Sequence, residues 1–170
     1  SLSVRSNAIA LEARGYEKSD YIFTHSNYAR SSVIKDYGIP ASKVITVVPG
    51  ANIPENLQID MTYKSQNQRE LNLVFVGREF RRKGLDLLLS ALKVVNKDQI
   101  KYRVHIIGGY LSDHIDFSDL CADYIIEHGV IDKTENIKNF VNIVSSCDIG
   151  ILTSRQEAGG MSLREFCALG

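Results

Sequence analysis

Short apolar runs alternate along the chain with stretches in which apolar residues recur every three or four positions. Residues 71–76 are rich in apolar and β-branched types, and they predict a buried strand. From Leu85 onward the apolar positions are 85, 88, 89, 92 and 95, which form the stripe of an amphipathic helix. Because strands alternate with helices in this way, the sequence predicts an α/β fold built on a parallel sheet.

The same two patterns predict the other elements. Helices are expected at residues 3–15, 27–37, 84–97, 118–127 and 134–147, and from residue 161. Strands are expected at residues 20–25, 43–48, 71–76, 102–107, 128–131 and 148–152. Ser26 is a candidate N-cap of the second helix and Gly38 its stop signal, while Asp132 and Glu135 suit a capping box.

Length and composition limit the classes of protein. A chain of 170 residues suits one full domain or pieces of two. Its 20 basic and 20 acidic residues balance, which argues against a nucleic-acid binder. We expect no signal peptide among these residues, and no apolar run reaches about 18 residues, so no segment is expected to span a membrane.

Metal and redox chemistry have weak support in the sequence. The histidines lack the spacing of metal ligands and are expected to be structural or exposed: His25, His105, His114 and His128. The cysteines are odd in number and include no C-x-x-C pair. They favour buried reduced thiols in a cytoplasmic protein: Cys121, Cys147 and Cys167.

A basic loop, Gly77-Arg78-Glu79-Phe80-Arg81-Arg82-Lys83-Gly84, joins the strand at 71–76 to the helix that follows. In open α/β sheets ligands bind at this end of the strands, and a helix N-terminus there attracts anions. Arg78 can grip a phosphate with its planar fork, and Lys83 adds a compact point charge. A solvated loop and a nucleic-acid patch at residues 81–83 are the alternatives, and the balanced charge argues against the second.

Two glutamates, Glu157 and Glu165, follow the apolar run at residues 149–152 and are separated by seven residues. Ionised carboxylates accept hydrogen bonds from neighbouring hydroxyls, such as those of a sugar or a ribose. The alternative is an ordinary loop glutamate followed by a solvated helix glutamate. Together with the basic loop, however, the pair suits a ligand with an anionic centre and a polyol at each end. A nucleotide diphosphate sugar has that layout.

The chain resembles a retaining glycosyltransferase of family 4 (group 1), which has the GT-B fold of two Rossmann-like domains facing a cleft. The resemblance implies a Rossmann-like parallel sheet with helices on both faces. It makes residues 1–53 the tail of the acceptor-side domain, 54–70 the inter-domain linker and 71–170 an incomplete donor-binding domain. Four segments carry it: 19–26, 43–52, 74–89 and 154–170.

The resemblance also implies roles for side chains. Arg78 and Lys83 would contact the donor diphosphate, Glu157 the transferred sugar and Glu165 the nucleotide ribose. Arg78, Lys83 and Glu157 would be the catalytic residues. No metal is expected, because these cations and a helix end supply positive charge and the chain has no Asp-x-Asp pair.

Backbone groups complete the implied donor site. N–H groups around Gly160 and Met161 would lie beside the sugar and phosphate, and Gly129 and Val130 would border the base. The implied reaction moves a sugar from a nucleotide diphosphate sugar to a glycan or lipid-linked acceptor, with retention of configuration. The implied location is the cytoplasm, or the membrane periphery for a full-length protein.

Two alternatives stay open at this point. The missing G-x-G-x-x-G argues against a nicotinamide-binding Rossmann enzyme. A non-catalytic remnant would bind a nucleotide sugar or a protein partner without transfer. In addition, the strand at 148–152 is expected at an unprotected sheet edge, which would favour self-association.

Overall fold

The computed structural model describes residues 2–57, 70–95, 100–113, 117 and 123–170. These residues form two compact units, 1–50 and 51–170. Of the predicted linker 54–70, residues 58–69 lie outside the described part of the chain.

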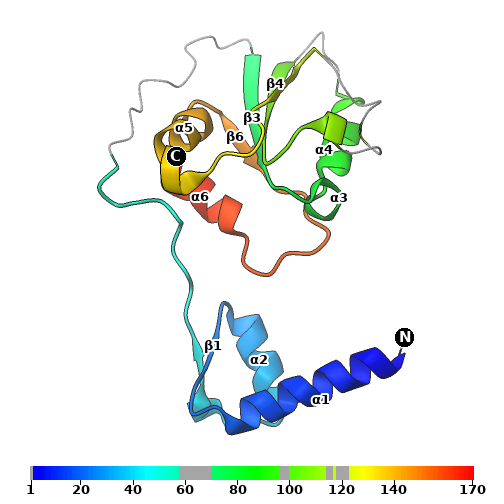
Figure 1. The fold of residues 1–170 in the computed structure, drawn as a ribbon, viewed down its shortest axis with the longest axis vertical. Helices are drawn as coiled ribbons and strands as arrows, with labels where there is room; N and C mark the ends of the chain where they lie inside the picture. The colour runs from blue at the N-terminus through cyan, green and yellow to red at the C-terminus, as the bar shows by residue number, and fades with distance from the viewer. Residues whose placement is uncertain (1, 58–69, 96–99, 114–116, 118–122) are drawn as a thin grey trace. The chain divides into compact units, whose positions relative to one another are not determined.

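The first unit is a small α/β element (Figure 1). Its elements in order are α1 (Leu2–Lys18), β1 (Ile22–Thr24), α2 (Asn27–Asp36), a 3₁₀ turn (Ala41–Lys43) and β2 (Val44–Thr46). The two strands pair in parallel, with Ile22 opposite Val44. Ser26 caps α2 by accepting a hydrogen bond from the backbone N–H of Ala29, as the sequence predicts. The predicted helices and strands of this region are therefore confirmed.

The second unit holds a four-stranded parallel sheet in the order β5-β4-β3-β6. The strands are β3 (Glu70–Val76), β4 (Lys101–Ile107), β5 (Ile125–Glu127) and β6 (Ile149–Ile151). The helices are α3 (Phe80–Lys83), α4 (Leu85–Leu92), α5 (Lys133–Ser145) and α6 (Met161–Leu169), with a 3₁₀ turn at Leu111–Asp113. Helices α3 and α4 lie on one side of the sheet and α5 and α6 on the other (Figure 1). The Rossmann-like parallel sheet is therefore confirmed, and β6 lies at an edge of the described sheet.

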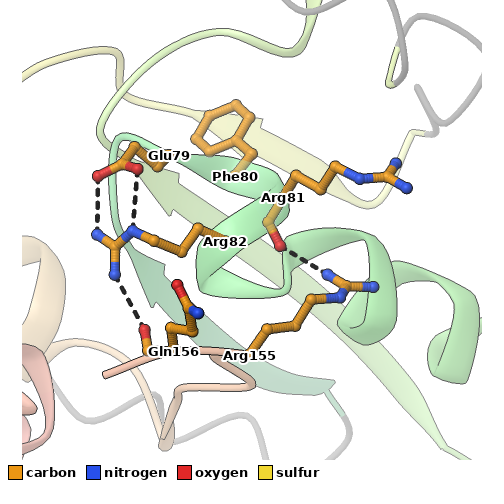
Figure 2. A pocket seen from close by; sticks show the side chains of 6 residues that line it. All are labelled: Glu79, Phe80, Arg81, Arg82, Arg155 and Gln156. Carbon is orange, nitrogen blue, oxygen red and sulfur yellow. Dashed lines mark hydrogen bonds and ion pairs between the residues drawn. The ribbon is translucent and has the colours of Figure 1, made fainter. Parts of the chain in front are cut away.

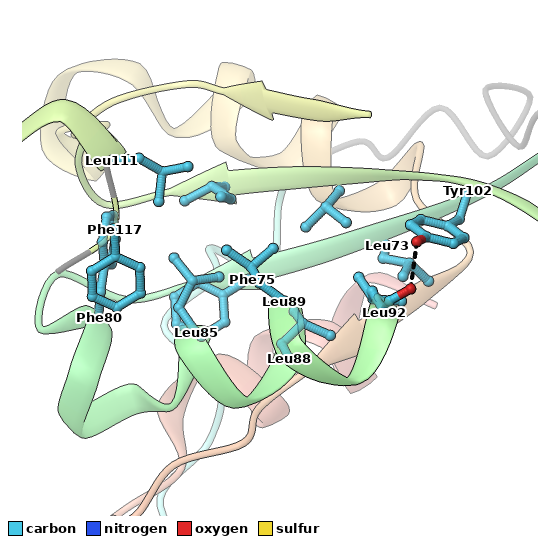
Figure 3. Close-up of a cluster of buried hydrophobic side chains, with 12 residues drawn as sticks. Leu73, Phe75, Phe80, Leu85, Leu88, Leu89, Leu92, Tyr102, Leu111 and Phe117 are labelled. Carbon is cyan, nitrogen blue, oxygen red and sulfur yellow. Dashed lines mark hydrogen bonds between the residues drawn. The ribbon is translucent and has the colours of Figure 1, made fainter. Parts of the chain in front are cut away.

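Alternation along β3 divides the core of this unit into two layers. Leu73 and Phe75 face α3 and α4, where twelve buried side chains pack together (Figure 3). Val74 belongs instead to the layer with α5 and α6, which includes Phe140. A strand buried on both faces has a nearly continuous apolar sequence, which is why residues 71–76 could be predicted as a strand from the sequence.

Three predictions about elements are wrong in part. The strand expected at 128–131 is not formed, and of these residues only Gly129 makes an isolated antiparallel bridge, to Gly109. Residues 125–127 form a strand and not the end of a helix, while residues 118–122 lie outside the described part. Hydrogen-bonded pairing with β4, which sets Val104 beside Ile125, decides this segment over its local pattern. The helix predicted at 84–97 ends at Leu92 and is preceded by the separate α3, because Gly84 takes a left-handed conformation with φ of 75° between them.

The cysteine prediction holds for one residue of the two that can be tested. Cys147 is buried, and that burial raises the pKa of its thiol to about 12. Cys167 lies on an exposed position of α6, which contradicts the expectation of a buried thiol. Helix α6 covers the sheet with a single face, which carries the buried Glu165 and Leu169. Cys167 does not belong to that face, which explains its exposure. Cys121 lies outside the described residues.

None of the helices in the described part of the chain combines the length and the apolar character needed to cross a bilayer.

Candidate functional site

The candidate site lies at the C-terminal ends of the parallel strands in the second unit. The loops that follow β3 and β4 touch each other there, and the N–H of Gly77 donates to the carbonyl of Ile107 at 2.9 Å. Gly108 has φ of 132°, and a Cβ on it would lie 2.2 Å from the carbonyl oxygen of Gly77. Only glycine therefore allows these two loops to approach so closely.

The chain after β6 packs against the junction of α3 and α4. The hydroxyl of Thr153 donates to the carbonyl of Gly84 at 2.6 Å, and the N–H of Arg155 donates to the carbonyl of Arg82 at 2.9 Å. Thr153 and Gly84 are 69 positions apart in the sequence, so these contacts join distant segments of the chain. As a result, the basic loop and the first glutamate come to the same place.

Lys83 and Glu157 are in direct contact. The ammonium Nζ of Lys83 lies 2.5 Å from Oε2 of Glu157, with the side chains 15% and 27% exposed. The hydroxyl of Ser154 also donates to Oε2 at 3.1 Å, and the N–H of Gly160 donates to Oε1 at 3.2 Å. Chiefly through the hydrogen bond from Lys83, these donors lower the pKa of Glu157 to about 2, against the opposing effect of burial. Glu157 is therefore an anion at neutral pH.

Glu165 lies on α6, and its side chain is only 4% exposed. Its carboxylate oxygen Oε1 accepts a hydrogen bond from Nζ of Lys133 at 2.6 Å. Lys133 is the first residue of α5, where the side chain of Asp132 caps the helix by accepting the N–H of Thr134 at 2.8 Å. The cap at Asp132 is predictable from the sequence, whereas Lys133 is not among the predicted site residues. The position of Lys133 directly after a predicted helix cap could have marked it as a candidate site residue. No local sequence pattern, however, pairs it with Glu165.

Arg78 lines a pocket of about 330 Å³ between the loops after β3, β4 and β5. Two predicted residues, Arg78 and Val130, are in its wall, and so is Lys133. The nearby Arg78 contributes to lowering the pKa of Asp132, although the hydrogen bonds from Thr134 contribute most. The full lining is Val76, Gly77, Arg78, Ile107, Gly108, Val130, Ile131, Asp132, Lys133 and Thr134.

Gly77 connects this pocket with the ion pair of Lys83 and Glu157. It lines the pocket, and a Cβ on it would lie 2.8 Å from Cγ of Lys83. The structure thus places two cation–carboxylate pairs around one end of the sheet: Lys83 with Glu157, and Lys133 with Glu165. The roles predicted for these residues stay predictions.

The predicted backbone groups lie in two places. Gly129 has φ of 63°, and its carbonyl accepts the N–H of Gly108 at 2.7 Å beyond the end of β4. Gly160, with φ of 57°, is the N-cap residue of α6, and Met161 is the partly exposed first residue of that helix. Helix α6 therefore begins four residues after Glu157, directly after its N-cap Gly160.

A second pocket, of about 680 Å³, adjoins the ion pair through the chain neighbours of Lys83 and Glu157 (Figure 2). Arg82 donates to both carboxylate oxygens of Glu79, at 2.9 and 2.8 Å, and to the carbonyl of Gln156 at 3.0 Å. The residues that line this second pocket are Glu79, Phe80, Arg81, Arg82, Arg155 and Gln156. Arg82 is thus already engaged by a carboxylate, which weakens the nucleic-acid alternative further.

Arg155 holds the same loop from another side. Its guanidinium donates to the two carboxylate oxygens of Asp86 at 2.7 Å each and to the carbonyl of Arg81 at 2.6 Å. Such two-pronged contacts fix the guanidinium plane. Arg82 and Arg155 therefore hold the loop that carries Glu157 against α3, and Arg155 is a second residue that sequence reasoning missed.

Among the described residues, no cluster of three or more His, Cys, Asp or Glu side chains is placed to hold a metal ion. Two of the histidines are nevertheless neighbours. The rings of His105 and His128 stack with centroids 5.2 Å apart, and Nδ1 of His105 lies 3.0 Å from Nε2 of His128. Desolvation by burial lowers the pKa of both rings.

The chain is similar to known proteins over most of its length. Residues 60–170 match the family described as glycosyl transferases group 1. An uncharacterized 41.2 kDa protein in the cps region of Klebsiella pneumoniae is 28% identical over 149 residues, covering 85% of this chain and 39% of that protein. An uncharacterized glycosyltransferase of Methanocaldococcus jannaschii is 23% identical over 149 residues, covering 86% of this chain and 38% of that protein. The chain thus spans about two fifths of the length of these relatives.

Solved structures share the fold. The apo form of a lipopolysaccharide outer core galactosyltransferase, WaaB, matches with a TM-score of 0.62 and 20% identity, over 86% of this chain and 40% of that one. At that identity the likeness establishes the fold, which is that of GT-B glycosyltransferases, and not the substrate.

Proposed function

The chain belongs to the group 1 glycosyl transferases, and on that premise we propose that it binds a nucleotide diphosphate sugar as the donor-binding half of a glycosyltransferase. The reaction would move the sugar to a glycan or lipid-linked acceptor with retention of configuration. In this proposal residues 1–53 are the tail of the acceptor-side domain, 54–70 the linker and 71–170 the donor domain. The proposed location is the cytoplasm, or the membrane periphery for a full-length protein.

The observation that carries the proposal is the contact between Lys83, the last residue of α3, and Glu157, in the chain after β6, 2.5 Å from nitrogen to oxygen. A lysine ammonium has three N–H donors, so Lys83 can keep Glu157 and still donate to a phosphate oxygen. Glu157, with a pKa lowered to about 2, remains ionised and can accept hydrogen bonds from sugar hydroxyls. One residue pair thus offers a cation to the diphosphate and an anion to the sugar.

The chemistry follows from charge. When the bond between the sugar and the diphosphate breaks, negative charge grows on the departing oxygens. Arg78, Lys83 and the N–H groups at the start of α6, near Gly160 and Met161, would stabilise that charge in the transition state. Fixed charges of this kind cost no reorganisation during the reaction.

We assign the remaining contacts in the same way. Glu165 would accept hydrogen bonds from the ribose hydroxyls, and Gly129 and Val130 would border the base beside the pocket that Arg78 lines. Glu157 would position the sugar without attacking it, since retention in this proposal has the acceptor enter on the face that the diphosphate leaves.

The test is calorimetric titration with uridine, guanosine and adenosine diphosphate sugars, with NAD as a further ligand. We expect one class of nucleotide sugar to bind. The variants Lys83→Ala and Arg78→Ala should each lose about tenfold or more in affinity, since a hydrogen bond to a charged group contributes about 1.5–3 kcal/mol. Lys101→Ala, an exposed lysine at the opposite end of β4, should bind like the wild type.

Unchanged affinity in both site variants would contradict the diphosphate assignment. Binding of NAD in place of nucleotide sugars would favour the nicotinamide alternative. Donor binding without transfer would favour the non-catalytic alternative.

A further inference from the structure

We propose that Lys133 is a positioning residue for the donor nucleotide, which holds the carboxylate of Glu165 in the orientation that accepts the ribose hydroxyls. The inference rests on the proposed function, because it takes Glu165 as the ribose ligand. It adds a residue from a different helix, and it makes recognition of the ribose depend on the packing of α5 against α6.

Two contacts fix the ammonium of Lys133. Its Nζ lies 2.6 Å from Oε1 of Glu165, and it also lies 3.7 Å from the centroid of the Phe140 ring. Phe140 is fully buried in the layer between the sheet and α5. A cation over a buried aromatic face is attracted by the ring, and desolvation strengthens that attraction. The ammonium is therefore held by the core on one side and by the carboxylate on the other.

The local backbone sets the start of the lysine side chain. Asp132 caps α5 through its carboxylate, which accepts both the N–H and the hydroxyl of Thr134, at 2.8 and 2.7 Å. Lys133 is thereby fixed as the first helical residue. Its side chain crosses to α6, which packs beside α5 on the same face of the sheet (Figure 1).

Burial makes this pairing decisive for Glu165. The glutamate side chain is 4% exposed, whereas that of Lys133 is 26% exposed and belongs to the wall of the pocket that also contains Arg78 and Val130. A buried carboxylate needs a charge or hydrogen-bond partner, since an unpaired one is strongly destabilising. The direction of the Glu165 carboxylate is therefore decided by where Lys133 lies.

The carboxylate still has capacity for a ligand. Its two oxygens offer about four lone-pair sites, and the bond from Lys133 uses one. The two hydroxyls of a ribose can then donate to the remaining sites, provided that the carboxylate does not rotate away. Without Lys133, the carboxylate of Glu165 could rotate away from the ribose hydroxyls.

The experiment compares ribose with deoxyribose. Affinities for uridine, guanosine and adenosine diphosphate and for their 2′-deoxy forms are measured by calorimetry, and the best-bound base is used for every variant. In the wild type the ribose form should bind about tenfold more tightly or better, as expected for one hydrogen bond to a charged acceptor. The Lys133→Met variant should bring that ratio close to one, and Lys133→Arg should restore part of it.

Lys138→Met is the matched control, because Lys138 is exposed on the same helix and the substitution changes the charge by the same amount. It should keep the wild-type ratio. A residue that only stabilised the fold would lower the melting temperature and leave the ratio unchanged. If Lys133→Met does not fold, Lys133→Gln retains most of the side-chain length and replaces it.

A double variant tests whether Lys133 acts through Glu165. Glu165→Gln alone should reduce the ratio, and adding Lys133→Met should reduce it no further. Full ribose preference in Lys133→Met together with a lost preference in Glu165→Gln would overturn this inference and leave the proposed function standing. A wild type that binds no nucleoside diphosphate would overturn the proposed function itself and the inference with it.

Discussion

The ion pair of Lys83 and Glu157 should stabilise the fold in a pH-dependent way. The perturbation is Lys83→Met, which removes the donor chiefly responsible for lowering the pKa of Glu157 from 4.5 to about 2. That lowering corresponds to about 3 kcal/mol at most, at about 1.36 kcal/mol for each pH unit. Because the glutamate side chain is 27% exposed, solvent screening reduces the expected contribution to about 1–2 kcal/mol.

The direction of the pH effect follows from linkage. A carboxyl group whose pKa is lower in the folded than in the unfolded chain stabilises the fold above the unfolded value and loses that contribution on acidification. For Glu157 the contribution is complete above about pH 5 and is lost as the pH falls from 4.5 toward about 2. The destabilisation caused by Lys83→Met should therefore be largest near pH 6 and less than half as large at pH 3.

The assay is urea unfolding of the full chain, followed by circular dichroism, for a double-mutant cycle of Lys83→Met and Glu157→Gln at pH 6 and pH 3. The cycle isolates the coupling between the two side chains. A coupling below about 0.3 kcal/mol at pH 6, or a coupling that does not shrink at pH 3, would refute the reasoning.

Three further predictions concern packing and reactivity. Gly84→Ala should destabilise the fold by about 2 kcal/mol or more, because φ is 75° and the added Cβ would lie 1.9 Å from a backbone oxygen. Gly15→Ala, in a helix with open space around the added Cβ, should be neutral or stabilising. Thermal unfolding of both variants is the measurement. Phe75→Ala should lower the free energy of unfolding by about 3–5 kcal/mol, measured in urea, because its ring is fully buried. Cys167 should react with a thiol reagent in the folded protein, and Cys147 only after unfolding, since burial raises its thiol pKa to about 12.

The sequence alone determined the elements whose burial is periodic. Residues 71–76 are apolar on both strand faces and the stripe from Leu85 has a helical period, so β3 and α4 were readable locally. The helix caps at Ser26 and Asp132 could also be predicted locally, because the side chain of a cap bonds to a backbone N–H within three residues. The family resemblance likewise depended on residues in four short segments.

The tertiary structure decided which distant groups meet. Residues 125–127 became a strand because an edge of β4 was available to pair with them, and no local pattern records that. Lys83 contacts Glu157 across 74 positions and Lys133 contacts Glu165 across 32. The first contact depends on Gly84 accepting a left-handed turn beside Thr153, and the second on α5 and α6 covering the same face of the sheet. A sequence pattern reports which side of an element is buried, whereas the partner of a buried charge is set by the path of the whole chain.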